Sequence, residues 1–211
     1  MLIDTTRAAF IAVDVQNDFC PGGALAVPEG DAVVPIINRL ARGFELCVAT
    51  QDWHPRGHVS FASSHPGAKA FDATVVAGRD ATLWPDHCVQ GSAGADFHPA
   101  FRVEPYRLVV RKGFRQNLDS YSAFFENDGT TPTGLDGYLR GLGASTVVIA
   151  GLALDYCVHY SAMDAAKLGY RVYVVRDATR AVGSPPGSVE RALADLAVRG
   201  VAIIESGEVF P

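Results

Sequence analysis

The chain has 211 residues, of which 48% are hydrophobic, and its formal net charge is -5. This length fits one α/β domain, or a domain with a large insertion, and the apolar content supports a sizeable core and excludes a disordered chain. The negative charge, in a chain without a run of Lys or Arg, argues against nucleic acid and anionic membranes as partners.

The N-terminal residues lack the basic and apolar segments of a secretory signal. The first apolar run, residues 8–13, is too short for a signal-peptide core or a membrane span. The spacing of the four cysteines matches neither a disulfide framework nor a CxxC pair: Cys20, Cys47, Cys88 and Cys157. Both observations predict a reducing, cytoplasmic location.

Apolar runs and helical patterns alternate along the chain. Six apolar runs are typical of strands covered on both faces: residues 8–15, 45–50, 106–111, 145–150, 170–176 and 201–205. Helical spacing marks most of the segments between them: residues 31–42, 133–142, 156–168 and 188–199, the last with Ser188 as its expected N-terminal cap. This alternation predicts an α/β fold with a doubly wound, six-stranded, mainly parallel sheet and helices on both faces.

Residues 51–105 break this alternation. The segment is rich in Gly, Pro, His and Trp, and long excursions from a compact domain are usually functional. No internal repeat, low-complexity tract or linker divides the chain. We therefore expect a single domain over residues 1–211, with an insertion at about 51–105 that carries part of an active site.

A metal-binding pattern opens this insertion. Asp52 and His54 follow an apolar run two residues apart, so in an extended chain both side chains face the same side. A turn through the following Pro and Gly would bring His58 back to the same point, and the later His87 could complete the set. One carboxylate with several imidazoles is a suitable donor set for Zn, Fe or Mn.

Reactive side chains also follow the predicted strands. In open α/β sheets ligands bind beyond the carboxyl ends of the strands, and there this chain has Asp14, Lys112 and Cys157. Cys157 falls near the first turn of a predicted helix, where unpaired N–H groups favour a thiolate and can bind an oxyanion. Taken alone, Cys157 fits a small buried core residue equally well.

Together these motifs resemble the isochorismatase-like cysteine hydrolases, and among them the nicotinamidase/pyrazinamidase family. The resemblance runs nearly from end to end. It rests on Val-Asp-Val-Gln-Asn-Asp-Phe at 13–19, Asp-Trp-His at 52–54 with His58, Trp-Pro-Asp-His-Cys at 84–88 with Gly-Ala-Asp-Phe-His at 94–98, Lys-Gly at 112–113 with Tyr-Ser-Ala-Phe at 121–124, and Gly-Leu-Ala-Leu-Asp-Tyr-Cys at 151–157. The Asp-x-His pair and the later His are typical of nicotinamidases, as opposed to relatives that lack a metal.

The resemblance implies a role for each matched position. The catalytic triad would be Asp14, Lys112 and Cys157. The oxyanion hole, beside a cis peptide at Leu152–Ala153, would be formed by the N–H groups of Ala153 and Cys157. The residues that contact the substrate ring would be Phe19, Trp84, Tyr121 and Leu152. One divalent metal ion would be held by Asp52, His54, His58 and His87.

Such an enzyme would hydrolyse nicotinamide to nicotinate and ammonia through a cysteine thioester, would also accept pyrazinamide, and would serve NAD salvage. Its expected partner is the small-molecule substrate alone. The residues leave three alternatives open: a hydrolase in which metal-activated water attacks, a non-metal cysteine amidase for another small amide, and a binding protein on the same fold. The intact set of acid, lysine and thiol argues against a mere binding protein.

Overall fold

The computed structural model describes residues 3–76 and 78–210, so residues 1–2, 77 and 211 of the expected domain lie outside the described residues. Its main sheet has six strands in the order β5-β2-β1-β6-β7-β8, and every neighbouring pair is parallel. The strands are β1 (Ala8–Val13), β2 (Leu46–Asp52), β5 (Tyr106–Lys112), β6 (Thr146–Leu152), β7 (Arg171–Arg180) and β8 (Ala202–Ile204). The predicted α/β fold with a six-stranded parallel sheet is confirmed.

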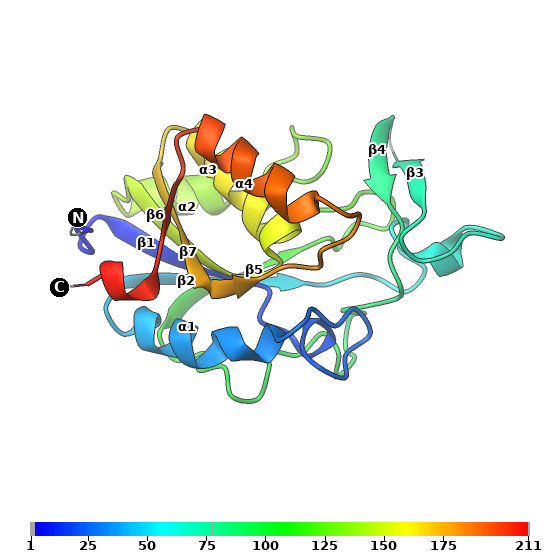
Figure 1. Ribbon diagram of the computed structural model, residues 1–211, viewed down its shortest axis with the longest axis horizontal. Coiled ribbons are helices and arrows are strands. Elements are labelled where there is room, and N and C mark those ends of the chain that lie inside the picture. Colours follow the sequence, from blue (N-terminus) through cyan, green and yellow to red (C-terminus); the bar gives the residue numbers. More distant parts are fainter. Residues whose placement is uncertain (1–2, 77, 211) are drawn as a thin grey trace.

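Helices cover the sheet on both faces, with α1 below it and the others above it in the view of Figure 1. They are α1 (Val33–Ala41), α2 (Leu135–Gly141), α3 (His159–Lys167) and α4 (Ser188–Val198). β1 is buried at every residue, and its alternate side chains enter different cores. Phe10 packs with the residues of α1, whereas Ile11 packs with those of α2, α3 and α4. Burial on both faces explains why β1 lacks polar alternation in the sequence. The edge strand β5 departs from the expected cover on both faces, because Arg107, Val109 and Arg111 are exposed.

The strand order reverses beside β1. From β1 the chain builds outwards through β2 to β5 at one edge, and it then returns to β6 on the other side of β1 and builds through β7 to β8. Loops that leave the carboxyl ends of β1 and β6 therefore diverge, which opens a crevice at this point of a doubly wound sheet. Asp14 directly follows β1, and Cys157 comes shortly after β6.

The insertion contains a short antiparallel hairpin that the sequence did not predict. Its strands are β3 (Ala73–Val76) and β4 (Arg79–Thr82), and Figure 1 shows it projecting at the right, apart from the main sheet. Neither strand has a fully buried residue. Each strand has only four residues, and β4 is largely polar, so the hairpin gives too short a signal for strand patterning to identify.

Helix α4 begins differently from the expected capping pattern. Ser188 is its first helical residue, and Gly187, in the left-handed region with φ 82, takes the cap position. The Ser188 hydroxyl instead donates a hydrogen bond of 2.6 Å to the Asp155 carboxylate. The predicted Ser cap was therefore wrong, because a buried acceptor elsewhere in the fold binds this hydroxyl.

The remaining helical pieces are short. They are 3-10 turns at Asn17–Phe19, Gly30–Ala32, Ala62–Ser64 and Ser206–Glu208, and a π-helical turn at Leu154–Val158. Across residues 3–76 and 78–210, no helix has both the length and the apolarity that a membrane crossing requires.

Candidate active site

Lys112 lies at the centre of a buried charged cluster at the carboxyl ends of the strands. Its Nζ is 2.8 Å from Asp14 Oδ2 and 3.4 Å from Cys157 Sγ, and it also pairs with Asp52. The main-chain oxygen of Ser120 accepts a further hydrogen bond of 3.1 Å from the same ammonium. The three side chains that the sequence placed on one edge of the sheet thus converge on one point.

The charges in this cluster follow from burial and from pairing. Burial raises the pKa of the Asp14 carboxyl, against the opposing influence of the Lys112 ammonium. Burial alone would lower the pKa of Lys112, but the carboxylates of Asp14 and Asp52 raise it well above its ordinary value. Burial also raises the pKa of the Cys157 thiol well above its ordinary value. The direction favours the thiol over the thiolate at Cys157, because the loss of water outweighs the nearby positive charge of Lys112.

Close backbone packing holds Asp14 against β6. Asp14 follows the last residue of β1 in the left-handed region, with φ 49, and its carboxylate accepts a hydrogen bond of 2.6 Å from the Thr50 hydroxyl. Opposite it, Gly151 has φ 119, and a Cβ there would lie only 2.1 Å from the main-chain oxygen of Val13. Only glycine allows β1 and β6 to approach this closely, so Gly151 brings the loop that carries Cys157 next to Asp14.

Cys157 lies in the π-helical turn that links β6 to α3. The peptide between Leu152 and Ala153 is cis, and the Ala153 carbonyl accepts hydrogen bonds from the N–H groups of Tyr156 and Val158, at 3.1 Å each. Cys157 is 6% exposed, and Cys157 and Ala153 both line one pocket. The turn therefore presents the thiol to this pocket at the start of a helix, as the sequence predicted.

Three side chains of the predicted metal set come together beside this cluster. The ligand atoms of Asp52, His54 and His87 all lie within 4.8 Å of one another. Asp52 Oδ2 is 3.5 Å from His54 Nε2 and 3.7 Å from His87 Nε2. The Nδ1–H groups of the two imidazoles donate to main-chain oxygens, of Gly113 and Pro85 respectively, at 2.8 Å each.

This arrangement fits a divalent metal ion. Because each Nδ1 donates to a main-chain oxygen, the Nε2 atom of each ring is left facing Asp52, and partners of this kind typically orient metal-binding histidines. Burial would lower the pKa of His54, but the Asp52 carboxylate raises it, so a proton competes with a metal for this imidazole. The described residues therefore include a possible metal-binding site of one carboxylate and two imidazoles.

His58 occupies a different position from the other predicted ligands. Its ring stacks on His54 with the ring centres 4.3 Å apart, and its Nε2 lies 3.3 Å from the main-chain oxygen of Leu118. The Ser60 hydroxyl lies 2.7 Å from its Nδ1. His58 forms a second possible trio with His54 and Asp119, rather than with Asp52 and His87. The sequence reasoning missed Asp119, whose only local signal is its place just before the aromatic motif at 121–124.

Aromatic side chains enclose the pocket above the thiol. Phe19, Trp84 and Tyr121, the predicted ring contacts, all line it, and the Trp84 indole N–H donates a hydrogen bond of 3.1 Å to the Tyr121 hydroxyl. Leu152, the fourth predicted contact, is fully buried and is not among the side chains that line this pocket. Side chains that the sequence reasoning did not assign also line it: Leu25, Asp119, Tyr156 and Val182.

The loop that carries Val182 is held by a buried carboxylate. Asp155, which is 6% exposed, accepts hydrogen bonds from the N–H groups of Val182 and Gly183, both at 2.9 Å, and from Ser188 Oγ. A second hydrogen bond holds the same loop, because the Tyr156 hydroxyl donates to the main-chain oxygen of Ser184 at 2.6 Å. The turn that presents Cys157 therefore also fixes the opposite wall of the pocket.

Replacing Asp155 by Ala should loosen that wall. The change leaves two loop N–H groups without their charged acceptor, so we expect the free energy of unfolding to fall by about 2–3 kcal/mol and KM to rise more than kcat falls. Denaturant unfolding and steady-state kinetics measure both effects. Asp195→Ala, which removes an exposed carboxylate on α4, is the matched control. A variant with wild-type stability and wild-type KM would contradict this role.

Comparison with known proteins shows the family to which this chain belongs. Residues 8–208 match the isochorismatase domain family. The nicotinamidase of Acinetobacter baylyi is 47% identical over 204 residues, which cover 97% of this chain and 95% of that protein.

Solved structures agree with the sequence relatives. A nicotinamidase/pyrazinamidase structure from Acinetobacter baumanii superposes with a TM-score of 0.95 and 45% identity, covering 98% of this chain and 99% of the other. The pyrazinamidase of Pyrococcus horikoshii, described in complex with zinc, gives a TM-score of 0.76 and 38% identity over 94% of this chain and 99% of its own. With a family match along most of its length and close relatives that share its whole fold, this chain belongs to the isochorismatase domain family and, within it, to the nicotinamidases.

Proposed function

We propose that this enzyme hydrolyses nicotinamide to nicotinate and ammonia through a thioester on Cys157, and that it also accepts pyrazinamide. The observation that carries the proposal is the buried contact of Lys112 with Asp14, Asp52 and Cys157, since it joins a thiol and a carboxylate to a possible metal site. Nicotinamide turnover would place the enzyme in NAD salvage, and a single hydrolase domain accounts for the sheet and both of its helical layers.

The proposed metal ligands are Asp52, His54 and His87, with His58 supporting His54 through ring stacking. A mixed oxygen and nitrogen donor set suits Zn, Fe or Mn. When bound, the ion would supply positive charge to polarise water or to attract the ring nitrogen of the substrate. The zinc described for the Pyrococcus horikoshii relative supports this assignment.

Substrate binding follows from the aromatic walls. The pyridine ring would stack between Phe19 and Trp84, with Tyr121 held in place by its hydrogen bond to the indole. Asp52 and the Cys157 thiol line one pocket. A pyridine ring whose nitrogen faces the proposed metal ligands would therefore hold its carboxamide over Cys157. The charged cluster is almost completely buried, so water screens the electrostatic interactions between the cluster and the substrate only weakly.

The first half of the reaction forms the thioester. The Asp14 carboxylate takes the thiol proton as the sulfur attacks the amide carbon, and the N–H groups of Ala153 and Cys157 would stabilise the resulting oxyanion. Asp14 then returns the proton to the amide nitrogen, the C–N bond breaks, and ammonia leaves. The raised pKa of Asp14 suits a group that both accepts and returns a proton.

The second half releases nicotinate. A water attacks the thioester carbon while Asp14 takes its proton, and the C–S bond breaks. The sulfur recovers a proton from Asp14, so one water is consumed for each nicotinate and ammonia formed. Lys112 keeps its positive charge throughout and stabilises the negative charge as it moves between carboxylate and sulfur.

The test is turnover of nicotinamide by purified protein, with nicotinate and ammonia both quantified. We expect equal amounts of each product from metal-replete protein, and much slower release after the metal is stripped with a chelator. Added hydroxylamine should divert part of the product to the hydroxamate, because it intercepts a thioester. Release of nicotinate with no hydroxamate would favour direct attack by metal-activated water, and no release from metal-replete protein would move the substrate to another small amide.

A further inference from the structure

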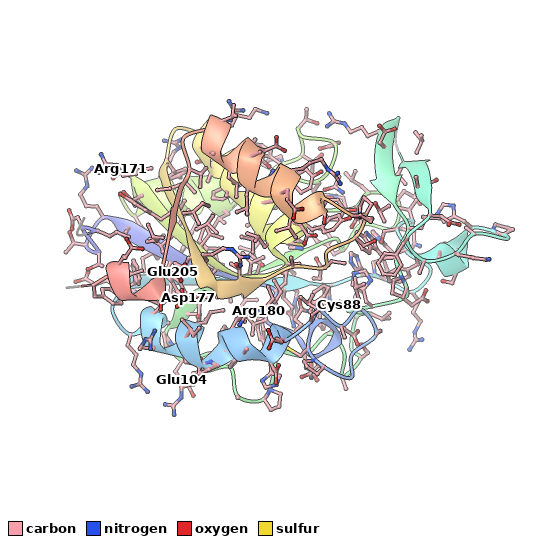
Figure 2. All side chains as sticks on the ribbon, viewed as in Figure 1. Cys88, Glu104, Arg171, Asp177, Arg180 and Glu205 are labelled. Atoms are coloured by element: carbon pink, nitrogen blue, oxygen red, sulfur yellow. The ribbon has the colours of Figure 1, made fainter. Side chains whose placement is uncertain are left out.

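Cys88, next to the proposed ligand His87, has an unusual backbone conformation. Its φ is 46, in the left-handed region that favours glycine, and its side chain is completely buried. A side chain with a Cβ holds this conformation only where surrounding contacts compensate for the strain. Figure 2 labels Cys88 close to the loop that joins β1 to α1, and this loop supplies the contact.

The contact is a hydrogen bond to a carboxylate from that loop. The Cys88 N–H donates to Asp18 Oδ2 at 2.7 Å, a short distance typical of a bond to a charged acceptor. The other oxygen of Asp18 accepts the Ala24 N–H at 3.1 Å. The main-chain N–H of Asp18 donates to the main-chain oxygen of Gly94 at 3.0 Å. Asp18 therefore connects its own loop, at 18–24, to the distant segment at 88–94.

Gly94 shows how tightly this carboxylate is enclosed. A Cβ at Gly94 would lie 2.1 Å from Asp18 Oδ2 and 2.4 Å from Oδ1. The glycine thus leaves the space that the carboxylate fills, and no side chain at 94 fits beside it. This accounts for Asp18 in the motif at 13–19 and for Gly94 in the motif at 94–98, two residues that the catalytic chemistry does not use.

The turn at Cys88 links two of the proposed metal ligands. On one side of it, His87 directs Nε2 towards Asp52. On its other side, the Cys88 main-chain oxygen accepts the His54 N–H at 3.0 Å, and His54 pairs with Val89 in a parallel bridge. The conformation at Cys88 therefore sets how His87 and His54 lie relative to each other.

We propose that Asp18 is a positioning residue for the metal site: its carboxylate holds the left-handed turn at Cys88 and so directs His87 towards Asp52 and His54. The inference rests on the proposed metal site. Asp18 itself is not among the side chains grouped there, so it would act through the backbone of Cys88. The absence of a side chain at Gly94 leaves the room in which this carboxylate lies.

The test measures Zn²⁺ affinity by competition with a chromophoric chelator, for wild type and Asp18→Ala. We expect the variant to bind Zn²⁺ about 10–100-fold more weakly, as is usual when an outer partner of a ligand is lost. Adding Cys88→Gly to the variant should recover most of the affinity, because glycine adopts the left-handed turn without help. Asp86→Ala is the matched control, since that neighbouring carboxylate bonds only to Ser63 Oγ among its hydrogen-bond partners in the described chain, at 2.5 Å.

The double variant separates positioning from general loss of stability. Cys88→Gly removes a buried side chain and cannot compensate for a merely weakened fold, so recovery of Zn²⁺ affinity would support the turn mechanism. Wild-type Zn²⁺ affinity in Asp18→Ala, or no recovery in the double variant, would overturn the inference while leaving the proposed metal site intact. Failure of the wild-type protein to bind Zn²⁺, Fe²⁺ or Mn²⁺ would overturn both.

Discussion

The Cys157→Ala protein should release ammonia from nicotinamide about 10⁴-fold more slowly than wild type, or slower still. The covalent route needs the sulfur, and the residual rate would come only from binding and from the oxyanion donors. The alternative, in which metal-activated water attacks directly, instead predicts near wild-type turnover, because Cys157 would then be a packing residue. Steady-state ammonia release at saturating nicotinamide decides between them.

Cys47→Ala is the control for this substitution. Cys47 is also buried, but it lies at the amino end of β2, where its thiol donates a hydrogen bond to the main-chain oxygen of Ala41. Both variants lose one buried thiol, so both should lose a similar, small amount of stability. Only Cys157→Ala should lose turnover, and a parallel loss in both variants would mean that the fold, rather than the chemistry, had failed.

Lys112→Met should damage both activity and stability. The change leaves Asp14 and Asp52 buried without the ammonium that neutralises them, and breaking such a buried pair costs about 3–5 kcal/mol. Turnover should fall by roughly 10³-fold or more, because Asp14 would then hold a proton at rest and could no longer accept one from the thiol. Denaturant unfolding and ammonia release measure the two effects.

The stability loss should depend on pH in a definite direction. Without Lys112, the main influence that opposes burial at Asp14 is lost, so burial raises the folded pKa of this carboxyl further above its unfolded value. A group of this kind is more stably folded when protonated, so the deficit of metal-free Lys112→Met should shrink in acid and grow as pH rises through the folded pKa. Lys167→Met, at an exposed lysine on α3, should show no such trend. A deficit that is the same at every pH would contradict the assigned role of Lys112.

Much of the fold was predictable because a strand that is buried on two faces produces a local run of apolar residues in the sequence. All six predicted strands occur, each within a few residues of its expected bounds, and the central strands β1, β2 and β6, which are covered on both faces, leave the most continuous apolar signal. The convergence of Asp14, Lys112 and Cys157 was also predictable. Parallel strands end at a common edge, so residues that follow them must meet there.

The sequence by itself therefore determined the parallel sheet, the edge at which its reactive residues gather, and the resemblance that assigns them a chemistry. The tertiary structure alone decided which side chains complete the site. It grouped His87 with Asp52 and His54 while stacking His58 on His54, and it brought Asp119 to the pocket. It also gave Asp18 and Asp155 their partners, because both carboxylates bind backbone N–H groups from distant segments. Such contacts depend on the path of long loops through space, and no local pattern of residues records that path.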